Sequence, residues 1–234
     1  MKYHKFISAY LTLLLSINTF AVDDPFEEYN RKIWAFNEFL DDNLAKPTAE
    51  VYTSITPNFI EIGISNFFRN LNELDNTVNQ LLQGRPLLAV NDFSRFLINS
   101  TLGLGGFIDV GSRFGLERHD EDFGQTLGSW GVGSGPFLMI PIYGPSTPRG
   151  LAGRSVSSVL SGTFAIEETD LRIGITALDA LETRARYLEV ETLIIGDRYS
   201  FIRDSYMQYQ AFETTNGEDQ ADDFVDDMDD FLLD

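Results

Sequence analysis

The chain has 234 residues, of which 17 are Lys or Arg and 36 are Asp or Glu, so its formal net charge is -19. A surface this acidic excludes nucleic acid as a natural partner, because binding to phosphates depends on Lys and Arg displacing counterions. Hydrophobic residues make up 43% of the sequence, which is enough apolar material for a folded core. The sequence contains no Cys and only two His. This excludes disulfides, thiolate metal sites, Cys nucleophiles and lipid attachment through Cys, and leaves little for His-centred catalysis.

Residues 1–21 have the pattern of an export signal peptide. Two lysines give a short positive start, and an apolar run follows before a small-x-Ala cleavage site that ends at Ala21. The alternative is an uncleaved membrane anchor, but the apolar run is shorter than the roughly 20 residues of a membrane span. The sequence therefore predicts an exported protein with no conventional transmembrane helix.

Through most of the remaining chain, apolar residues recur at three- and four-residue steps, the period of amphipathic helices. Asp24 is an expected N-cap followed by Pro25 in the first turn, and Gly84 is an expected C-cap. Only short strand-like runs occur, for example near 190–195, so the predicted fold class is all-α. The predicted helices cover approximately residues 25–40, 57–71, 72–82, 86–102, 173–188 and 199–212.

Residues 103–150 differ from their flanks because they hold most of the glycines together with four prolines. Such a stretch cannot form long helices, yet residues 137–143 within it are strongly apolar. An apolar loop left in water would usually mark a binding or membrane site. We therefore expect this segment either to fold back as a hairpin that fills the core or to face lipid or a partner.

The end of the chain is acidic, with nine carboxylates and no basic residue in residues 218–234. Like charges repel and keep a segment extended, so we expect a disordered solubilising tail. Apolar residues at helical spacing inside it leave a short partner-binding helix as an alternative.

Sequence motifs for catalysis, metals and cofactors are missing. The glycine-rich run Gly131–Pro136 lacks the ending of a P-loop and the spacing of a dinucleotide-binding loop. No Ser lies in a nucleophile-elbow motif, and His119 in a polar stretch is expected to be a solvated loop residue. We expect no catalytic residues, no bound metal and no cofactor, which favours a binding or transport protein over an enzyme.

A series of short motifs, in order from about residue 24 to residue 210, resembles the MlaA (VacJ) family of outer-membrane proteins. The matching segments are Asp24–Arg31, Phe36-Asn37, Ile64–Phe67, Asn70–Glu73, Val78-Asn79, Leu82–Gly84, Phe93–Phe96, Asn99–Thr101, Gly103–Asp109, Phe123–Gly128, Trp130–Pro136, Pro141 and Tyr143–Ser146. The resemblance implies a helical domain over residues 22–217, ring-shaped, with a central glycine-rich hairpin loop region.

The resemblance also implies a function. Family members lie in the inner leaflet of the outer membrane of Gram-negative bacteria, often beside a trimeric porin. They let misplaced phospholipids pass from the outer leaflet through an amphipathic pore to a periplasmic lipid carrier, which maintains lipid asymmetry. By the same resemblance, Gly131, Gly133 and Gly135 belong to the pore loop, where glycine gives the backbone freedom. Asn37 matches a segment tied to the conformation of the pore.

One feature departs from the family pattern. Its members are commonly lipoproteins acylated on a Cys, whereas this sequence has none. Attachment at the periplasmic face of the outer membrane would then rest on apolar helix faces and a protein partner. The competing hypothesis is a soluble periplasmic or surface adaptor with a closed apolar core and no lipid pore.

Overall fold

A computed structural model describes residues 24–215 except 162, 164–166, 192–193 and 195. The predicted all-α class is confirmed, with one small two-stranded sheet among the described residues. The expected signal peptide and the acidic tail lie outside the described residues. The elements in chain order are α2 (Glu27–Leu40), the π-helical turn η1 (Asp41–Ala45), α3 (Lys46–Ile55), α4 (Asn58–Leu82), α5 (Pro86–Thr101), the 3-10 turn η2 (Gly111–Phe114), α6 (Phe123–Ser129), β1 (Leu138–Ile140), β2 (Gly144–Ser146), α7 (Pro148–Leu160), α8 (Thr169–Glu191) and α9 (Arg198–Thr215).

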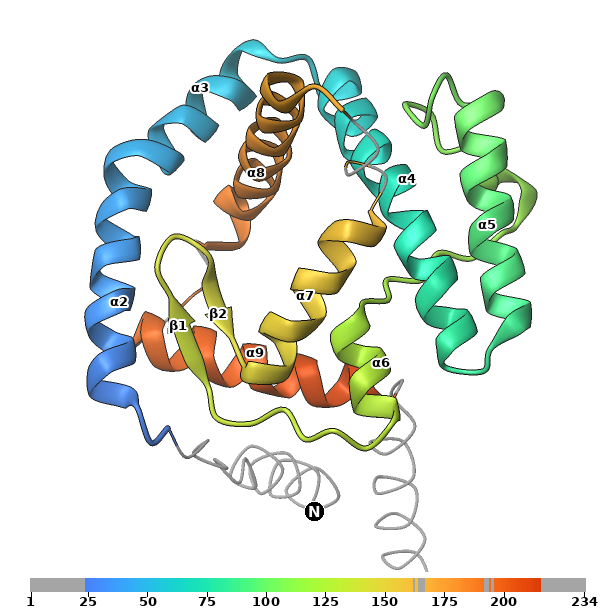
Figure 1. The fold of residues 1–234 in the computed structure, drawn as a ribbon. Coiled ribbons are helices and arrows are strands. Elements are labelled where there is room, and N and C mark those ends of the chain that lie inside the picture. The colour runs from blue at the N-terminus through green and yellow to red at the C-terminus, as the bar shows by residue number, and fades with distance from the viewer. Residues whose placement is uncertain (1–23, 162, 164–166, 192–193, 195, 216–234) are drawn as a thin grey trace, which may run out of the picture.

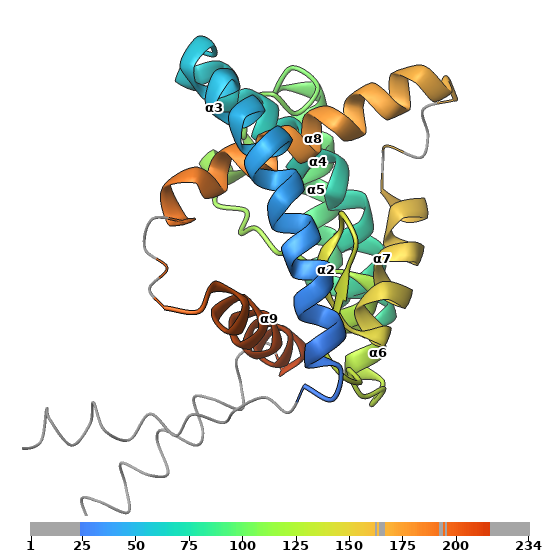
Figure 2. The same ribbon diagram turned by 90° about the vertical axis from the view of Figure 1, so that its left-hand side faces the viewer.

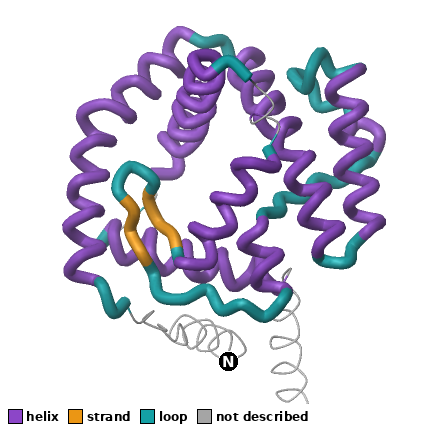
Figure 3. The backbone as a smooth tube through the Cα atoms, in the orientation of Figure 1, coloured by secondary structure: helices purple, strands orange, loops and turns teal. Residues whose placement is uncertain are grey.

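The helices surround the hairpin formed by β1 and β2. In Figure 1, α2 and α3 form the left side, α4 descends on the right and α9 crosses the bottom, while the hairpin and α7 lie inside. Helix α5 packs against the outer side of α4. The turned view shows α8 crossing behind α3 (Figure 2), and the hairpin is the orange segment among purple helices in Figure 3.

Helices extend further than predicted in two places. The first helix was expected to end near Leu40, but the chain continues through η1 into α3, where Pro47 lies in the first turn and breaks no hydrogen bond. The two helices expected over 57–82 are one helix, α4, because nothing near residue 72 ends it. The C-cap was correctly predicted, since Gly84 has a φ of +78°.

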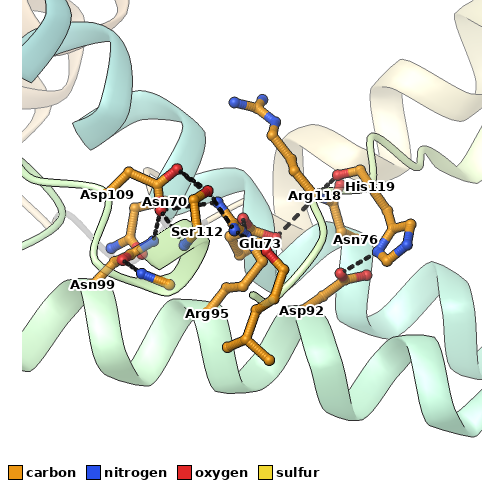
Figure 4. Close-up of polar contacts among 12 residues, drawn as sticks. Asn70, Glu73, Asn76, Asp92, Arg95, Asn99, Asp109, Ser112, Arg118 and His119 are labelled. Atoms are coloured by element: carbon orange, nitrogen blue, oxygen red, sulfur yellow. Dashed lines mark hydrogen bonds and ion pairs between the residues drawn. The ribbon is translucent and has the colours of Figure 1, made fainter. Parts of the chain in front are cut away.

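The neighbouring helices α4 and α5 pack through polar rather than apolar faces. Buried positions include Glu73, Arg95 and Asn99, while Leu87 on α5 is 83% exposed. Arg95 Nε donates to Glu73 Oε1 at 2.8 Å, and the Arg95 guanidinium also binds Asp109. Figure 4 shows these groups gathered between the two helices. The apolar stripe predicted on α5 therefore faces outward, whereas on α4 Phe68 is buried.

Buried apolar residues are few by comparison. The largest cluster joins Phe137, Met139 and Tyr199, with the partly buried Trp34 and Tyr206 packed against it. This cluster fixes the hairpin to α2 and α9. No helix among the described residues is long and apolar enough to cross a membrane.

Candidate functional site

The site is built around the hairpin. Strands β1 and β2 pair antiparallel, with Leu138 opposite Ser146 and Ile140 opposite Gly144, so the turn consists of Pro141 to Tyr143. Ile142 at the tip is 81% exposed and has a φ of +68°, which is unusual for a β-branched residue. An exposed, strained apolar residue at a loop tip indicates a functional constraint rather than a packing role.

Two asparagines of α2 hold the free edge of β1. Asn30 Nδ2 donates to the Phe137 carbonyl at 3.1 Å, and its Oδ1 accepts from the Met139 amide at 2.8 Å. Asn37 Nδ2 donates to the Ile140 carbonyl at 2.9 Å, and its Oδ1 accepts from the Ile142 amide at 2.7 Å. Because the two residues are seven positions apart, they lie on one face of the helix. Their amides take the place of a third strand.

The opposite side of the hairpin contacts α7. The Arg154 guanidinium lies over the Tyr143 ring, 5.2 Å from its centroid. A cation over an aromatic face is attracted by the ring quadrupole, by about 0.5–1 kcal/mol at an exposed site. The turn is thus held by side chains of α2 on one side and of α7 on the other.

The three predicted glycines lie before the hairpin, in the segment that leads from α6 to β1. Gly131 and Gly135 have φ values of +88° and +76°, so both need the conformational freedom of glycine. Nothing lies within 4 Å of a Cβ added at Gly133. Arg149 anchors this segment through the Val132 carbonyl at 3.0 Å. The hairpin turn therefore falls at residues 141–143 and not at 131–136, and Asn37 contacts the turn while the glycines do not.

A cavity of about 1250 Å³ opens beside the hairpin turn. Tyr143 and Arg154 border it, and its other walls come from α4, α6, α8 and α9. Apolar side chains such as Phe68 and Ile173 share this lining with carboxylates and with Arg172. The cavity can therefore accommodate both charged and apolar groups of an amphipathic ligand.

Comparison with known proteins identifies the family. The MlaA lipoprotein family matches residues 22–213. The chain belongs to the MlaA family. Relatives named intermembrane phospholipid transport system lipoprotein MlaA are 36% identical in Shigella flexneri and 35% in Escherichia coli. Each of these two matches covers 83% of this chain and 80% of the relative.

The fold agrees with a solved structure that concerns the structural basis for maintenance of bacterial outer membrane lipid asymmetry. The TM-score is 0.74 at 34% sequence identity, over 82% of this chain and 99% of that one. The MlaA relatives are named lipoproteins, whereas these 234 residues contain no Cys that could carry acyl chains.

Two carboxylates that line the cavity of this MlaA-family chain have pKa values raised by burial. Asp75 is 7% exposed, and burial raises its pKa from the ordinary value of 3.8 to about 6, with a further increase from the charge of Asp122. A hydrogen bond from Asn79 Nδ2 to Asp75 Oδ1, at 2.8 Å, partly opposes this shift. Burial also raises the pKa of Asp179 on the facing helix. The cavity therefore holds carboxylates that favour the protonated form more than surface groups do.

We expect Asp75→Asn to stabilise the protein at pH 7.5 by roughly 2 kcal/mol. The folded-state pKa is raised, so the penalty for ionising Asp75 is absent below about pH 4, grows up to about pH 6 and is complete above it. Chemical denaturation at pH 4.5 and 7.5 measures this effect, with the exposed Asp42→Asn as the control. Equal stability of Asp75→Asn and the parent protein at both pH values would contradict the assignment.

Several important residues escaped prediction from the sequence, namely Asn30, Tyr143 and Arg154. For Asn30 a signal was available in the sequence, because it lies seven residues before Asn37 in an aromatic-rich helix. His119 was expected to be solvated, but its side chain is 21% exposed and its Nδ1 lies 2.6 Å from Asp92 Oδ1. No group of three or more metal-ligating side chains occurs within the described part of the chain.

Proposed function

We propose that this chain takes part in intermembrane phospholipid transport and helps to maintain the lipid asymmetry of the outer membrane. The cavity carries this proposal, because it is bordered by the hairpin turn and lined by both polar and apolar side chains. A phospholipid headgroup passing apolar surroundings needs such a polar path, since an unsolvated charge there costs several kcal/mol. The relatives' name and the solved structure's subject support the same role.

In this proposal the outward apolar faces bind the inner leaflet from the periplasmic side. Fully burying a Leu, Ile or Phe side chain contributes about 1.5–3 kcal/mol, so several of them together exceed a single acyl chain. Strongly exposed members of these faces include Ile55, Phe59, Leu87, Leu102 and Leu104, at 64–83%. A trimeric porin beside the protein and a periplasmic lipid carrier below it are the proposed partners. A soluble adaptor would instead bury these side chains.

The transport role can be tested by filling the cavity. Ala177 lines the cavity on α8, whereas Ala152 on α7 is exposed outside it. We expect Ala177→Trp to raise the amount of phospholipid in the outer leaflet several-fold, to the level of a strain lacking the gene. Ala152→Trp should leave it at the wild-type level. Labelling of intact cells with a membrane-impermeant amine reagent measures this amount. Wild-type labelling in the deletion strain would refute the function, and wild-type labelling in Ala177→Trp alone would refute the cavity as the path.

Membrane attachment is tested separately. We expect the protein to stay in the outer-membrane fraction through salt and carbonate washes, because its apolar faces are embedded. The double variant Leu87→Glu and Leu104→Glu should be released, since a carboxylate in the hydrocarbon costs about 2.5–3.5 kcal/mol. Ser155→Glu on exposed α7 is the matched control. Release of the wild-type protein would favour the adaptor alternative.

A further inference from the structure

A second cavity, of about 340 Å³, lies apart from the hairpin, where α3, the start of α4 and α8 meet at the top of Figure 1. Tyr52 of α3, Glu61 of α4, and Glu182 and Arg186 of α8 line it. Nothing in the path described above uses these four side chains.

Three buried oxygens at this cavity lack hydrogen-bond partners among the described residues. They are Tyr52 Oη, Glu61 Oε1 and Glu182 Oε2. The Glu182 side chain is only 4% exposed, and its other oxygen pairs with Arg186 Nε at 3.0 Å. Burial, followed by the charges of Glu61 and Glu182, raises the pKa of Tyr52. The Tyr52 phenol therefore stays protonated, and the charges of both carboxylates favour this neutral form.

Unpaired buried oxygens call for a donor, because native structures leave few such atoms without a partner. A primary ammonium has three N–H donors and no acceptor, which matches three oxygens, two of them on carboxylates. A trimethylammonium group has the same charge but no N–H to donate. The lining thus distinguishes primary amines from quaternary ones.

Arg186 lines this cavity, and Arg69 of α4, which is outside the lining, is near enough to Glu182 and Arg186 for their charges to act on it. Arg69 makes no ion pair within the described residues, and its Nε is buried without a hydrogen bond. Burial and the nearby charges of Arg118 and Arg186 lower the pKa of Arg69. A cluster of arginines with one unpaired member suits a phosphate, which accepts bidentate hydrogen bonds from guanidinium.

Two of the helices that border the cavity carry exposed apolar side chains. On α3, Val51 and Ile55 are 57% and 74% exposed, and on α4, Phe59 and Ile62 are 68% and 54% exposed. An amine and a phosphate next to an exposed apolar surface fit a lipid with acyl chains better than a free water-soluble amine.

We propose that this cavity binds the headgroup of a phospholipid carrying a primary amine, with the ammonium at Tyr52, Glu61 and Glu182 and the phosphate at Arg186 and Arg69. The inference rests on the proposed function. It adds the class of phospholipid that the protein selects, and it adds a second site at which the lipid is bound.

The test is a competition between two lipids with identical acyl chains. Purified, delipidated full-length protein in detergent is mixed with equal amounts of phosphatidylethanolamine and phosphatidylcholine, and bound lipid is counted by native mass spectrometry. We expect a preference for phosphatidylethanolamine of about tenfold, the effect of about one hydrogen bond to a charged group. Glu61→Gln, Glu182→Gln and Tyr52→Phe should each reduce the ratio toward one. The exposed Glu50→Gln on α3 should not change it.

The two readouts separate this inference from the proposed function. Total bound lipid reports lipid binding as such, whereas the ratio reports this cavity. A wild-type ratio near one, or an unchanged ratio in all three variants, overturns the headgroup site even if total binding is normal. Displacement of the lipid by an equal concentration of water-soluble phosphoethanolamine would show a free amine site instead and would overturn the lipid assignment. Glu61→Gln, Glu182→Gln and Tyr52→Phe are conservative changes, so a shared folding failure is a poor explanation for a loss of the lipid preference. Circular dichroism checks that each variant is folded.

Discussion

Replacing Arg95 by Ala is expected to destabilise the protein by about 3–5 kcal/mol, the largest stability effect of any single change considered. The Arg95 and Glu73 side chains are each 2% exposed, and the guanidinium also binds Asp109, the Ser112 hydroxyl and the Leu116 carbonyl. Without it, Glu73 becomes a buried carboxylate with no cation. Denaturant titration of the full chain in detergent measures the loss, and exposed Arg113→Ala in η2 is the matched control.

The pH dependence of this variant gives a sharper test. Burial already raises the pKa of Glu73 although Arg95 opposes it, so removing Arg95 raises it further. A raised carboxylate pKa destabilises the folded state above that pKa, and protonation relieves the penalty below it. The cost of Arg95→Ala should therefore be smaller at pH 5 than at pH 8. A cost that is the same at both pH values would show that lost packing, and not the unpaired carboxylate, is responsible.

This polar interface also shows what the sequence could and could not predict. The apolar period on α5 correctly indicated an amphipathic helix, because Leu87, Val90, Phe93 and Leu97 recur on one face. The apolar period of a helix does not say which face of the helix is buried. In a protein surrounded by water, the apolar face would be buried. Here Asp92 and Arg95 are buried and Leu87 is exposed, which a chain adapted to a lipid environment can tolerate.

The hairpin was predictable only in part. The apolar stretch 137–143 left open a hairpin that fills the core or a segment that faces lipid or a partner. The structure has a hairpin with Phe137 and Met139 buried and Ile142 and Tyr143 exposed at its turn. Its exact turn could not be predicted, because the strands are three residues each and carry no long alternation. The contacts that position it join residues more than 100 positions apart, at Asn30 and Asn37. No local pattern encodes such a pairing.

Charged contacts of the same long-range kind join helices that are far apart in the sequence. Arg184 of α8 binds both oxygens of Asp41 at 2.6 and 2.7 Å, and it also binds Glu191. These contacts join the π-helical turn after α2 to the end of α8. The sequence predicted a helix at Arg184 but ended the first helix near Leu40, before Asp41, and the strand-like run expected from residue 190 was wrong at Glu191, which lies in α8. The proximity of these residues could not be predicted, since ion pairs between distant residues leave no periodic signal.

A functional effect close to that of Ala177→Trp is expected from Asn37→Ala. Loss of this side chain frees the Ile140 carbonyl and the Ile142 amide, so the contact of Arg154 with Tyr143 remains and the hold from α2 on the turn is lost. If the turn controls access to the cavity, outer-leaflet phospholipid should rise several-fold, toward the level of a strain without the gene. Impermeant amine labelling measures the lipid, and hydrogen exchange at the Ile142 amide measures the release of the turn.

Asn43→Ala provides the matched control, because Asn43 is exposed and its amide donates only to the Phe39 carbonyl one turn earlier. It removes the same side chain from the adjoining helical turn without touching the hairpin. The two readouts for Asn37→Ala must change together if the turn is a gate. Fast exchange at Ile142 with wild-type lipid labelling would mean that the turn moves freely without affecting transport. The cavity would then be open in both states, and the path would be controlled elsewhere.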